Sequence, residues 1–289
     1  MLSSIKTYFS LIKFSHTIFA LPFAIIGFSL AISNQNYSFN LQKFLLVIAC
    51  MVFARSAAMA FNRYIDRKFD GQNPRTIVRE IPSGKISPTA ALLFVIICCF
   101  GFVASAFLIN KLCFYLSPIA LIVVLGYSFT KRFTPLCHLI LGLGLALAPI
   151  GAYLALTERF DVLPLLFSAI VFFWVSGFDI IYALQDDEFD KSQNLKSIPV
   201  YLGRKNALVL SRIFHFTTFL LVVTAFFYGN FYWPFIVGAL AFSSLLFYQH
   251  TLVKPNDLSK VTLAFGTTNG IASVVFCVFV CSDIFLRIT

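Results

Sequence analysis

Acidic side chains are scarce in this sequence, and most of them are concentrated in two short windows. Eight of the twelve aspartate and glutamate residues lie in residues 66–80 and 179–190. Carboxylate oxygens are hard ligands that suit Mg²⁺, and Mg²⁺ readily shares its coordination shell with water and with substrate phosphates. Two facing windows of this kind predict a site at which Mg²⁺ ions hold a diphosphate group.

In the first window the polar residues recur with a helical period. Asn62, Asp66 and Asp70 follow one another at intervals of four residues, and Arg55 precedes Asn62 by seven. This spacing places them on one stripe of an α-helix. Arg55 and Asn62 lie within an otherwise apolar stretch, where a charged or amide side chain is costly and by default marks a functional site that faces the interior of a helix bundle.

The second window repeats this pattern. Tyr182, Asp186 and Asp190 are four residues apart, and Asp179 precedes Tyr182 by three, which predicts that they share one helical face. Facing pairs from the two windows would bring four carboxylates within a few ångströms, and such a cluster needs cations. The alternative is that these acids balance nearby lysines and arginines on a solvated loop. The matched spacing of the two windows favours the metal site.

Basic residues near both windows could bind the remaining oxygens of a diphosphate, or a carboxylate of a second substrate. The candidates are Arg75, Arg79, Lys131, Arg132, Lys191 and Lys196.

The elements that must position these residues are membrane spans. The chain has 289 residues, of which 59% are hydrophobic and 12% are charged, whereas a soluble domain has about 25% charged residues. This composition excludes a soluble globular domain, a disordered tail and a disulfide-rich secreted module. A span needs about 20 apolar residues. We predict an all-α polytopic membrane protein, a single domain over residues 1–289, with nine spans bundled around a central cavity, at 8–33, 41–63, 88–109, 113–130, 136–156, 161–182, 207–229, 231–250 and 261–286.

The distribution of basic residues predicts the orientation of these spans. With a cytoplasmic N-terminus, one side of the membrane carries most of the lysines and arginines, and the other side carries only Lys43, Lys111, Arg159 and Arg287. This asymmetry is typical of the positive-inside rule. The net charge of +10 therefore reflects topology rather than nucleic-acid binding. We expect a bacterial inner-membrane protein, surrounded by lipid, with its active site near the cytoplasmic side and no obligate protein partner.

The cysteines and histidines give no indication of a metal site. The seven cysteines lie within or at the edges of apolar stretches and form no CxxC pair, which is typical of buried small hydrophobic residues. The four histidines, at positions 16, 138, 215 and 250, show no metal-binding spacing. We expect no zinc site.

The two windows resemble the two aspartate-rich motifs of the UbiA superfamily of intramembrane aromatic prenyltransferases. The first motif is Asn62-x-x-x-Asp66-x-x-x-Asp70, followed by Pro74-Arg75-Thr76-x-x-Arg79-x-x-Pro82-Ser-Gly84. The second is Asp179-x-x-Tyr182-x-x-x-Asp186-x-x-x-Asp190, followed by Lys196-Ser197-Ile198-Pro199. Arg55, and Tyr127-x-x-x-Lys131-Arg132 after the fourth span, also fit, so the resemblance covers essentially the whole chain.

The resemblance implies an Mg²⁺-dependent transfer of a polyprenyl group from polyprenyl diphosphate to an aromatic acid in ubiquinone or menaquinone biosynthesis, with release of diphosphate. It implies that Asn62, both aspartates of the first motif, and Asp186 and Asp190 form the metal–diphosphate site. Arg55, Tyr127 and Asp179, with Tyr182 beside them, are candidates for the acceptor side or for support of it. The apolar interior would hold the prenyl tail. Most of the 36 phenylalanines are expected to pack against one another or face lipid.

Two departures from the motifs concern the acceptor. Arg63 follows Asn62 where the family commonly has aspartate, and the first span carries Lys13-Phe-Ser-His16 in place of an Arg-x-Asp-like start. Both resemble the branch proposed to prenylate a dihydroxynaphthoate in the futalosine route to menaquinone, although His16 could equally be a polar anchor at the membrane interface. The sequence thus leaves 4-hydroxybenzoate and 1,4-dihydroxy-6-naphthoate open as acceptors. A membrane transporter with acidic cytoplasmic gates is the alternative from a different functional class.

Overall fold

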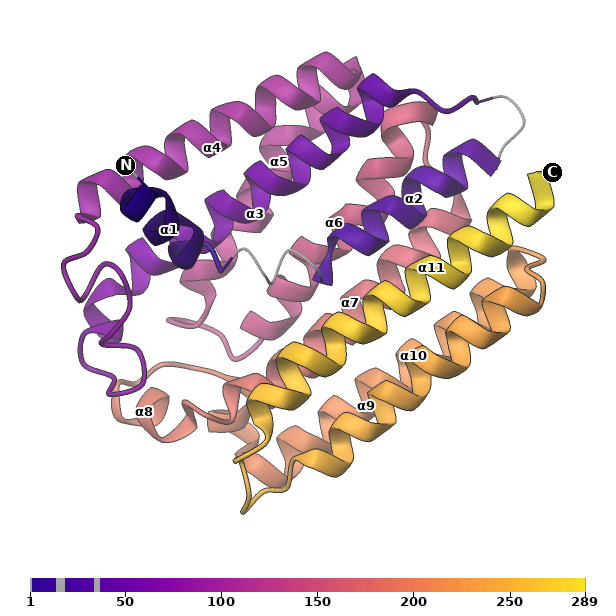
Figure 1. Ribbon diagram of the computed structural model, residues 1–289. Coiled ribbons are helices and arrows are strands. Elements are labelled where there is room, and N and C mark those ends of the chain that lie inside the picture. Colours follow the sequence, from indigo (N-terminus) through magenta and orange to yellow (C-terminus); the bar gives the residue numbers. More distant parts are fainter. Residues whose placement is uncertain (1, 14–18, 34–36, 289) are drawn as a thin grey trace.

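The structure, a computed structural model, describes residues 2–13, 19–33 and 37–288. The regular secondary structure of the described part is helical apart from one isolated β-bridge between Lys254 and Asp257. In chain order the elements are α1 (Leu2–Leu11), α2 (Leu21–Ser33), α3 (Leu41–Asp70), α4 (Pro88–Ile109), α5 (Lys111–Thr130), α6 (Cys137–Thr157), α7 (Val162–Ala183), α8 (Asp187–Ser192), α9 (Ile198–Tyr228), α10 (Trp233–Leu252), the π-helix η2 (Leu263–Thr268) and α11 (Asn269–Ile288). The long helices run side by side in one bundle (Figure 1).

Eight helices of the described chain are long and apolar enough to cross a membrane, which confirms the all-α polytopic class. The prediction of one continuous span at residues 8–33 was wrong. This stretch contains α1 and α2 as separate helices, and α2 has 13 residues, fewer than the roughly 20 needed to cross a bilayer. Residues 14–18, with His16, lie outside the described part of the chain. Pro22 lies in the first turn of α2, where proline is tolerated.

Burial differs between the helices in the way that a lipid environment requires. In α6 and α7 the most apolar stretches are 56% buried, whereas in α5 the corresponding value is 11%. The side chains of Phe100 on α4 and Ile122 on α5 are 77% and 72% exposed. Exposed apolar surface on this scale would be unstable in water. Helices α6 and α7 therefore form the centre of the bundle, and α5 faces the lipid.

The central helices approach one another through small residues, as is common in membranes. A Cβ atom added at Gly142 on α6 would lie 2.3 Å from Ser176 Oγ and 2.6 Å from the carbonyl oxygen of Phe172, both on α7. One added at Gly27 on α2 would lie 2.0 Å from the carbonyl oxygen of Pro149 on α6. Glycine at these positions allows α6 to pack directly against both neighbours.

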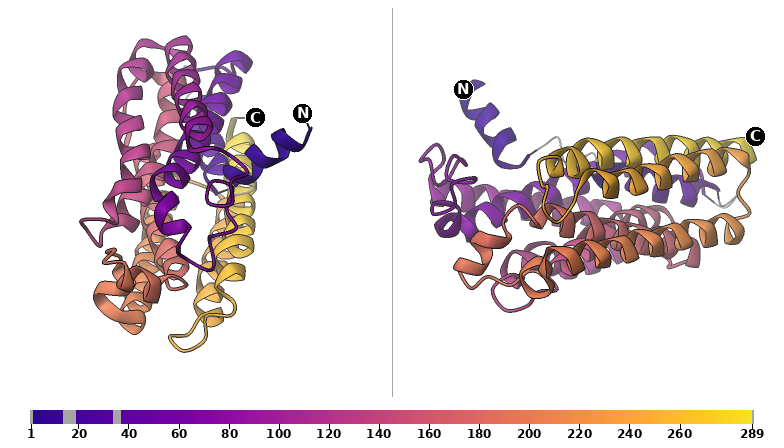
Figure 2. Two further views of the ribbon diagram at one scale, coloured as in Figure 1. Left: turned by 90° about the vertical axis from the view of Figure 1, so that its left-hand side faces the viewer. Right: turned by 90° about the horizontal axis from the view of Figure 1, so that it is seen from below.

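The polar connections lie at one end of this bundle. Helix α8 and the connection between α3 and α4 occupy the end that also carries α1, whereas the C-terminal part of α11 lies at the opposite end (Figures 1 and 2). The two acidic windows therefore meet at the same end of the molecule.

We expect Gly142→Ala to lower the thermal unfolding midpoint in detergent, because the new methyl group overlaps the backbone of α7. Overpacking of this kind costs about 1–3 kcal/mol. Gly151→Ala is the matched control on the same helix, since no atom lies within 4 Å of the added Cβ and removing a helical glycine stabilises by about 0.5–1 kcal/mol. Equal midpoints for the two variants would contradict this packing.

Candidate active site

A polar cavity of about 240 Å³ lies among the C-terminal half of α3, the connection after it, the α5–α6 connection, α7 and α8. Six basic and five acidic side chains line it. Twelve of the fifteen site residues predicted from the sequence are among the lining residues: Arg55, Asn62, Asp66, Asp70, Arg75, Arg79, Tyr127, Lys131, Asp179, Tyr182, Asp186 and Asp190. The fold thus brings both aspartate windows to one cavity.

The first window has the predicted geometry, since α3 is continuous from Leu41 to Asp70. Asn62 Nδ2 donates a hydrogen bond of 3.0 Å to Asp66 Oδ2, one turn further along the helix. Asp66 also lies 3.6 Å from a guanidinium nitrogen of Arg132. Asp70, at the end of the helix, accepts a hydrogen bond of 2.6 Å from Arg79 Nη1 in the connection that follows.

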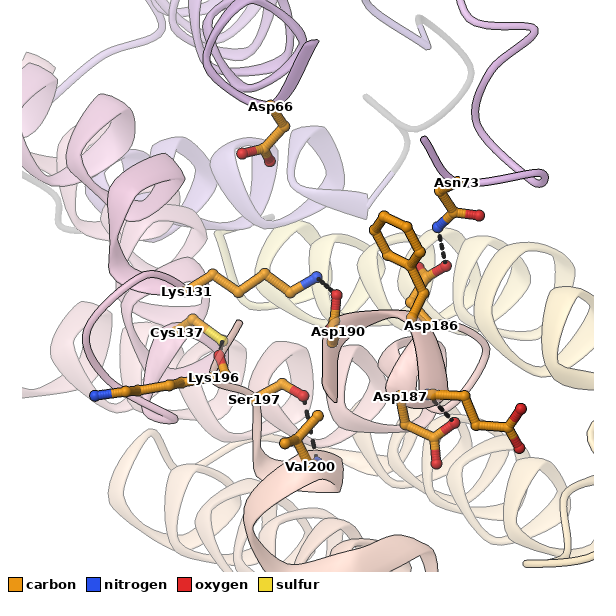
Figure 3. Close-up of polar contacts among 12 residues, drawn as sticks. Asp66, Asn73, Lys131, Cys137, Asp186, Asp187, Asp190, Lys196, Ser197 and Val200 are labelled. Carbon is orange, nitrogen blue, oxygen red and sulfur yellow. Dashed lines mark hydrogen bonds and ion pairs between the residues drawn. The ribbon is translucent and has the colours of Figure 1, made fainter. Parts of the chain in front are cut away.

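The second window differs from the predicted continuous helix. Helix α7 ends at Ala183 and α8 begins at Asp187, so the chain turns between Tyr182 and Asp186. Even so, Asp186 and Asp190 both face the cavity. Asp186 forms a two-point ion pair with Arg75 and accepts a hydrogen bond of 3.1 Å from Asn73 Nδ2. Asp190 accepts one of 2.8 Å from Lys131 Nζ, and Figure 3 shows Asp66 opposite this pair.

These ion pairs set the protonation preferences of the groups outside the spans. Burial alone would raise the pKa of Asp186, but the hydrogen bonds and charge of Arg75 outweigh burial and hold that pKa below its ordinary value. Burial raises the pKa of Asp190, and the charge of Lys131 offsets this only in part. Burial would lower the pKa of Lys131, yet the adjacent Asp190 carboxylate raises it. Lys131 therefore stays cationic, and Asp186 stays ionised.

The remaining acidic and basic residues of this region point away from the cavity. Asp187 and Glu188 both pair with Arg204 on α9, at 2.6 and 2.8 Å, and Figure 3 shows Asp187 directed away from Asp186. Lys191 and Lys196 are exposed and do not line the cavity, and Lys196 Nζ donates to the carbonyl oxygen of Phe133. Arg132, the third predicted residue outside the lining, reaches the cavity only through its pairing with Asp66.

The donor set of the cavity fits Mg²⁺. Within residues 2–13, 19–33 and 37–288, no three His, Cys, Asp or Glu side chains converge closely enough to hold a metal ion, because each motif carboxylate is turned toward a basic residue. Two carboxylate oxygens of the cavity are nevertheless buried without any hydrogen-bond partner among the described residues, namely Asp70 Oδ2 and Asp190 Oδ2. A buried, unsatisfied carboxylate oxygen is costly, and hard oxygen ligands of this kind suit Mg²⁺.

Sequence reasoning missed His138 and Asn73. His138 is 2% exposed, and its Nε2 accepts a hydrogen bond of 3.3 Å from the backbone N–H of Ile198. The ring proton is therefore on Nδ1, which lies 2.7 Å from Asp179 Oδ2 and donates to it. No sequence spacing indicates this contact, because it joins α6 to α7. Asn73 precedes Pro74 in a turn, which is a common place for asparagine. Its contact with Asp186 joins the α3–α4 connection to the segment between α7 and α8, so no local sequence pattern indicates it.

An apolar cavity of about 290 Å³ adjoins the polar one, and Arg55, Tyr127 and Leu141 line both. Its wall consists mainly of aliphatic side chains from α3, α5 and α6, such as Val47, Val123 and Leu145. The only phenylalanines among the described lining residues are at positions 102 and 160. Arg55, Tyr127 and Leu141 therefore lie where the two cavities meet.

Most buried aromatic residues lie elsewhere. Phe23, Trp174, Phe242 and Phe276 pack together between α2, α7, α10 and α11, with ring centroids 4.9–6.4 Å apart in the contacting pairs. This agrees with the expectation that most phenylalanines serve packing. One aromatic residue of this half does reach the polar cavity. Phe265, in the π-helix η2, lies with its ring centroid 4.2 Å from that of Tyr182.

Comparison with known proteins identifies similar chains along most of the length. The model of the UbiA prenyltransferase family matches residues 20–278. A 4-hydroxybenzoate octaprenyltransferase from Aliivibrio fischeri (strain MJ11) is 31% identical over 232 residues, which are 78% of each chain. The apo structure of a UbiA homolog from Aeropyrum pernix K1 superposes with a TM-score of 0.81 at 30% identity, over 95% of this chain and 98% of that one.

A third similar protein is a UbiA homolog from Archaeoglobus fulgidus, whose structure contains GPP and Mg²⁺. It superposes with a TM-score of 0.73 at 23% identity, over 96% of this chain and 99% of that one. At this identity the similarity establishes a common fold.

We expect His138→Leu to lower the thermal stability of the protein, because it leaves the Asp179 carboxylate and the Ile198 N–H without partners. Removing one partner of a buried charged hydrogen bond costs about 2–4 kcal/mol. His138→Gln is the control, since glutamine can both donate to Asp179 and accept from Ile198, and it should lose far less. Equal losses for both variants, measured by unfolding in detergent, would show that ring packing rather than hydrogen bonding matters here.

Proposed function

Because the chain belongs to the UbiA prenyltransferase family, we propose that it transfers a polyprenyl group from polyprenyl diphosphate to a ring carbon of an aromatic acid of the 4-hydroxybenzoate type. The observation that carries this proposal is the pair of adjoining cavities, one polar and one apolar, that meet at Arg55 and Tyr127. A substrate with a charged head and a long hydrocarbon tail matches this arrangement. The alternative function of a membrane transporter has no support, because the family to which the chain belongs consists of prenyltransferases.

Asp66, Asp70, Asp186 and Asp190, with Asn62, would hold Mg²⁺ at the polar cavity. When bound, Mg²⁺ would neutralise the charge that grows on the departing diphosphate. The unsatisfied oxygens of Asp70 and Asp190 support this assignment.

The basic partners of these carboxylates would bind the diphosphate oxygens. Arg75, Arg79 and Lys131 each already lie within 4 Å of a motif aspartate at the cavity wall. The fork of an arginine guanidinium binds phosphate oxygens in two-point fashion. Once the aspartates hold metal, these three side chains are free to turn toward the diphosphate. Arg132, Lys191 and Lys196, which lie outside the lining, would contribute only to the electrostatic potential at the entrance.

The prenyl tail would occupy the apolar cavity, where aliphatic side chains exclude water from the reacting carbon. The carbon–oxygen bond of the allylic diphosphate breaks, diphosphate leaves, and a new carbon–carbon bond forms to the acceptor ring, which then loses a proton. Asp179, which accepts a hydrogen bond from His138, would accept this ring proton. Arg55 would bind the acceptor carboxylate beside Tyr127, and Tyr182 would pack near the ring.

Relatives support the choice of acceptor. The relative from Aliivibrio fischeri carries the name 4-hydroxybenzoate octaprenyltransferase, and we propose the same class of acceptor here, in the synthesis of ubiquinone or menaquinone. The second candidate is 1,4-dihydroxy-6-naphthoate, which is favoured by Arg63 at a position where the first motif commonly has aspartate.

The same proposal includes the membrane arrangement. We propose a single prenyltransferase domain over residues 1–289 in a bacterial inner membrane, with a cytoplasmic N-terminus and a polar cavity that opens toward the cytoplasm. The short helix α2 would be the ninth membrane-embedded segment, because Phe23 and Ile26 are fully buried between its neighbours. The excess of basic residues at the end that carries the cavity supports this orientation.

We expect Asp186→Asn to reduce prenyl transfer in isolated membranes by about 100-fold or more, since it weakens a metal ligand and the contact with Arg75. Asp187→Asn is the matched control, because the neighbouring carboxylate pairs with Arg204 outside the cavity, and it should retain activity within about threefold of the wild type. EDTA should abolish wild-type activity and Mg²⁺ should restore it. Full activity of Asp186→Asn, or activity in EDTA, would contradict the assignment.

We expect labelled isoprenoid diphosphate to be incorporated into 4-hydroxybenzoate by membranes that contain the protein. The same assay with 1,4-dihydroxy-6-naphthoate tests the second candidate, and the acceptor with the higher kcat/KM identifies the physiological class. Arg55→Gln should raise KM for the preferred acceptor by about 10-fold or more, because it removes a charged hydrogen bond. An unchanged KM would remove Arg55 from the acceptor site.

A further inference from the structure

Arg63 lines the polar cavity but has no partner in the described chain. Its side chain is 5% exposed, and it forms no hydrogen bond or ion pair with any described residue. Its Nε is buried without a hydrogen-bond partner. Arg63 departs from the family motif, and none of the metal or diphosphate contacts proposed above uses it.

The other basic residues of the cavity differ from Arg63. Arg75, Arg79 and Lys131 are each paired with a motif aspartate, and Lys13 is exposed. Arg55 also forms no hydrogen bond or ion pair with another described residue, but it lies eight residues earlier on the same helix, which corresponds to about 12 Å along the axis. The cavity therefore contains two unpaired guanidinium groups at two depths, of which Arg63 is buried and Arg55 is partly buried. Only Arg55 has been given a ligand above.

A buried guanidinium without a counter-charge is unfavourable in a folded protein. The acids nearest to Arg63 do not satisfy it. Asp70 is paired with Arg79, and Glu80 accepts a hydrogen bond from the hydroxyl of Ser10 on α1, with no Arg63 nitrogen within 4 Å of either carboxylate. The positive charge is thus available to a ligand that enters the cavity.

We propose that Arg63 binds an oxyanion of a substrate inside the polar cavity. The proposal rests on the proposed function, in which two oxyanions enter this cavity: the diphosphate of the prenyl donor and the carboxylate of the aromatic acceptor. A planar guanidinium fork recognises either group. The bound oxyanion would supply a counter-charge for Arg63. The free-energy cost of the buried, unpaired guanidinium would then disappear on binding, and this would increase the affinity for the substrate.

The test compares Arg63→Gln with Arg67→Gln, which makes the same change of charge one turn further along α3. Arg67 does not line the cavity and donates to the carbonyl oxygen of Tyr64. We expect Arg63→Gln to unfold in detergent at the same temperature as the wild type or higher, because it removes an uncompensated charge. We expect its KM for one substrate to rise about 10- to 100-fold, with Arg67→Gln unchanged.

The substrate whose KM rises identifies the oxyanion, the prenyl diphosphate or the aromatic acid. Arg63→Lys keeps the charge without the fork and should recover part of the affinity. The proposal is overturned if both KM values of Arg63→Gln stay within twofold of the wild type. If Arg63→Gln does not fold, the same criterion applies to Arg63→Lys.

A binding measurement separates this proposal from the proposed function. Inorganic pyrophosphate with Mg²⁺, and 4-hydroxybenzoate alone, are each added to the purified protein, and the shift in unfolding temperature is recorded. This readout needs no turnover. A wild-type shift that Arg63→Gln loses, and Arg67→Gln keeps, supports anion binding at Arg63 even if no prenyl transfer is observed. Equal shifts in all three proteins overturn it.

Discussion

The organisation of the end that carries the polar cavity depends on one constraint, which is that an uncompensated charge buried beside a bilayer is costly. Each aspartate of the two motifs is paired with a basic residue from a different segment: Arg75 links the α3–α4 connection to Asp186, and Lys131 links the α5–α6 connection to Asp190. These pairs hold three connections around one cavity. The close packing of α6 against α2 and α7 fixes the helices that these connections join.

Under the proposed function, metal and diphosphate would replace the present basic partners of the motif aspartates. In the described chain no three ligands converge as a preformed metal site, because arginine and lysine occupy the positions that metal and diphosphate would take. The arginine and lysine side chains that neutralise the aspartates in this structure could then neutralise the departing diphosphate. An enzyme built in this way keeps its carboxylates compensated at every stage of binding, which low dielectric surroundings require.

Sequence alone could predict those parts of the site that depend on local geometry. The stripe of Asn62, Asp66 and Asp70 was predictable because α3 is an uninterrupted helix with a fixed period. The second motif keeps the same spacing across a break between α7 and α8, which periodicity does not reveal. His138 could not be predicted as a partner of Asp179, because that contact depends on how α6 packs against α7. The break between α1 and α2 was missed because hydropathy does not distinguish one span from two short helices.

The exposure of α5 has a consequence for the length of the hydrocarbon chain. Ile119 lines the apolar cavity and is also 58% exposed, so the cavity reaches the lipid-facing surface beside a helix that is mostly unburied. Under the proposed function, a prenyl tail longer than the cavity would extend past this helix into the acyl chains of the bilayer, which are an equally good solvent for it. The cavity would then set no upper limit on the length of the tail.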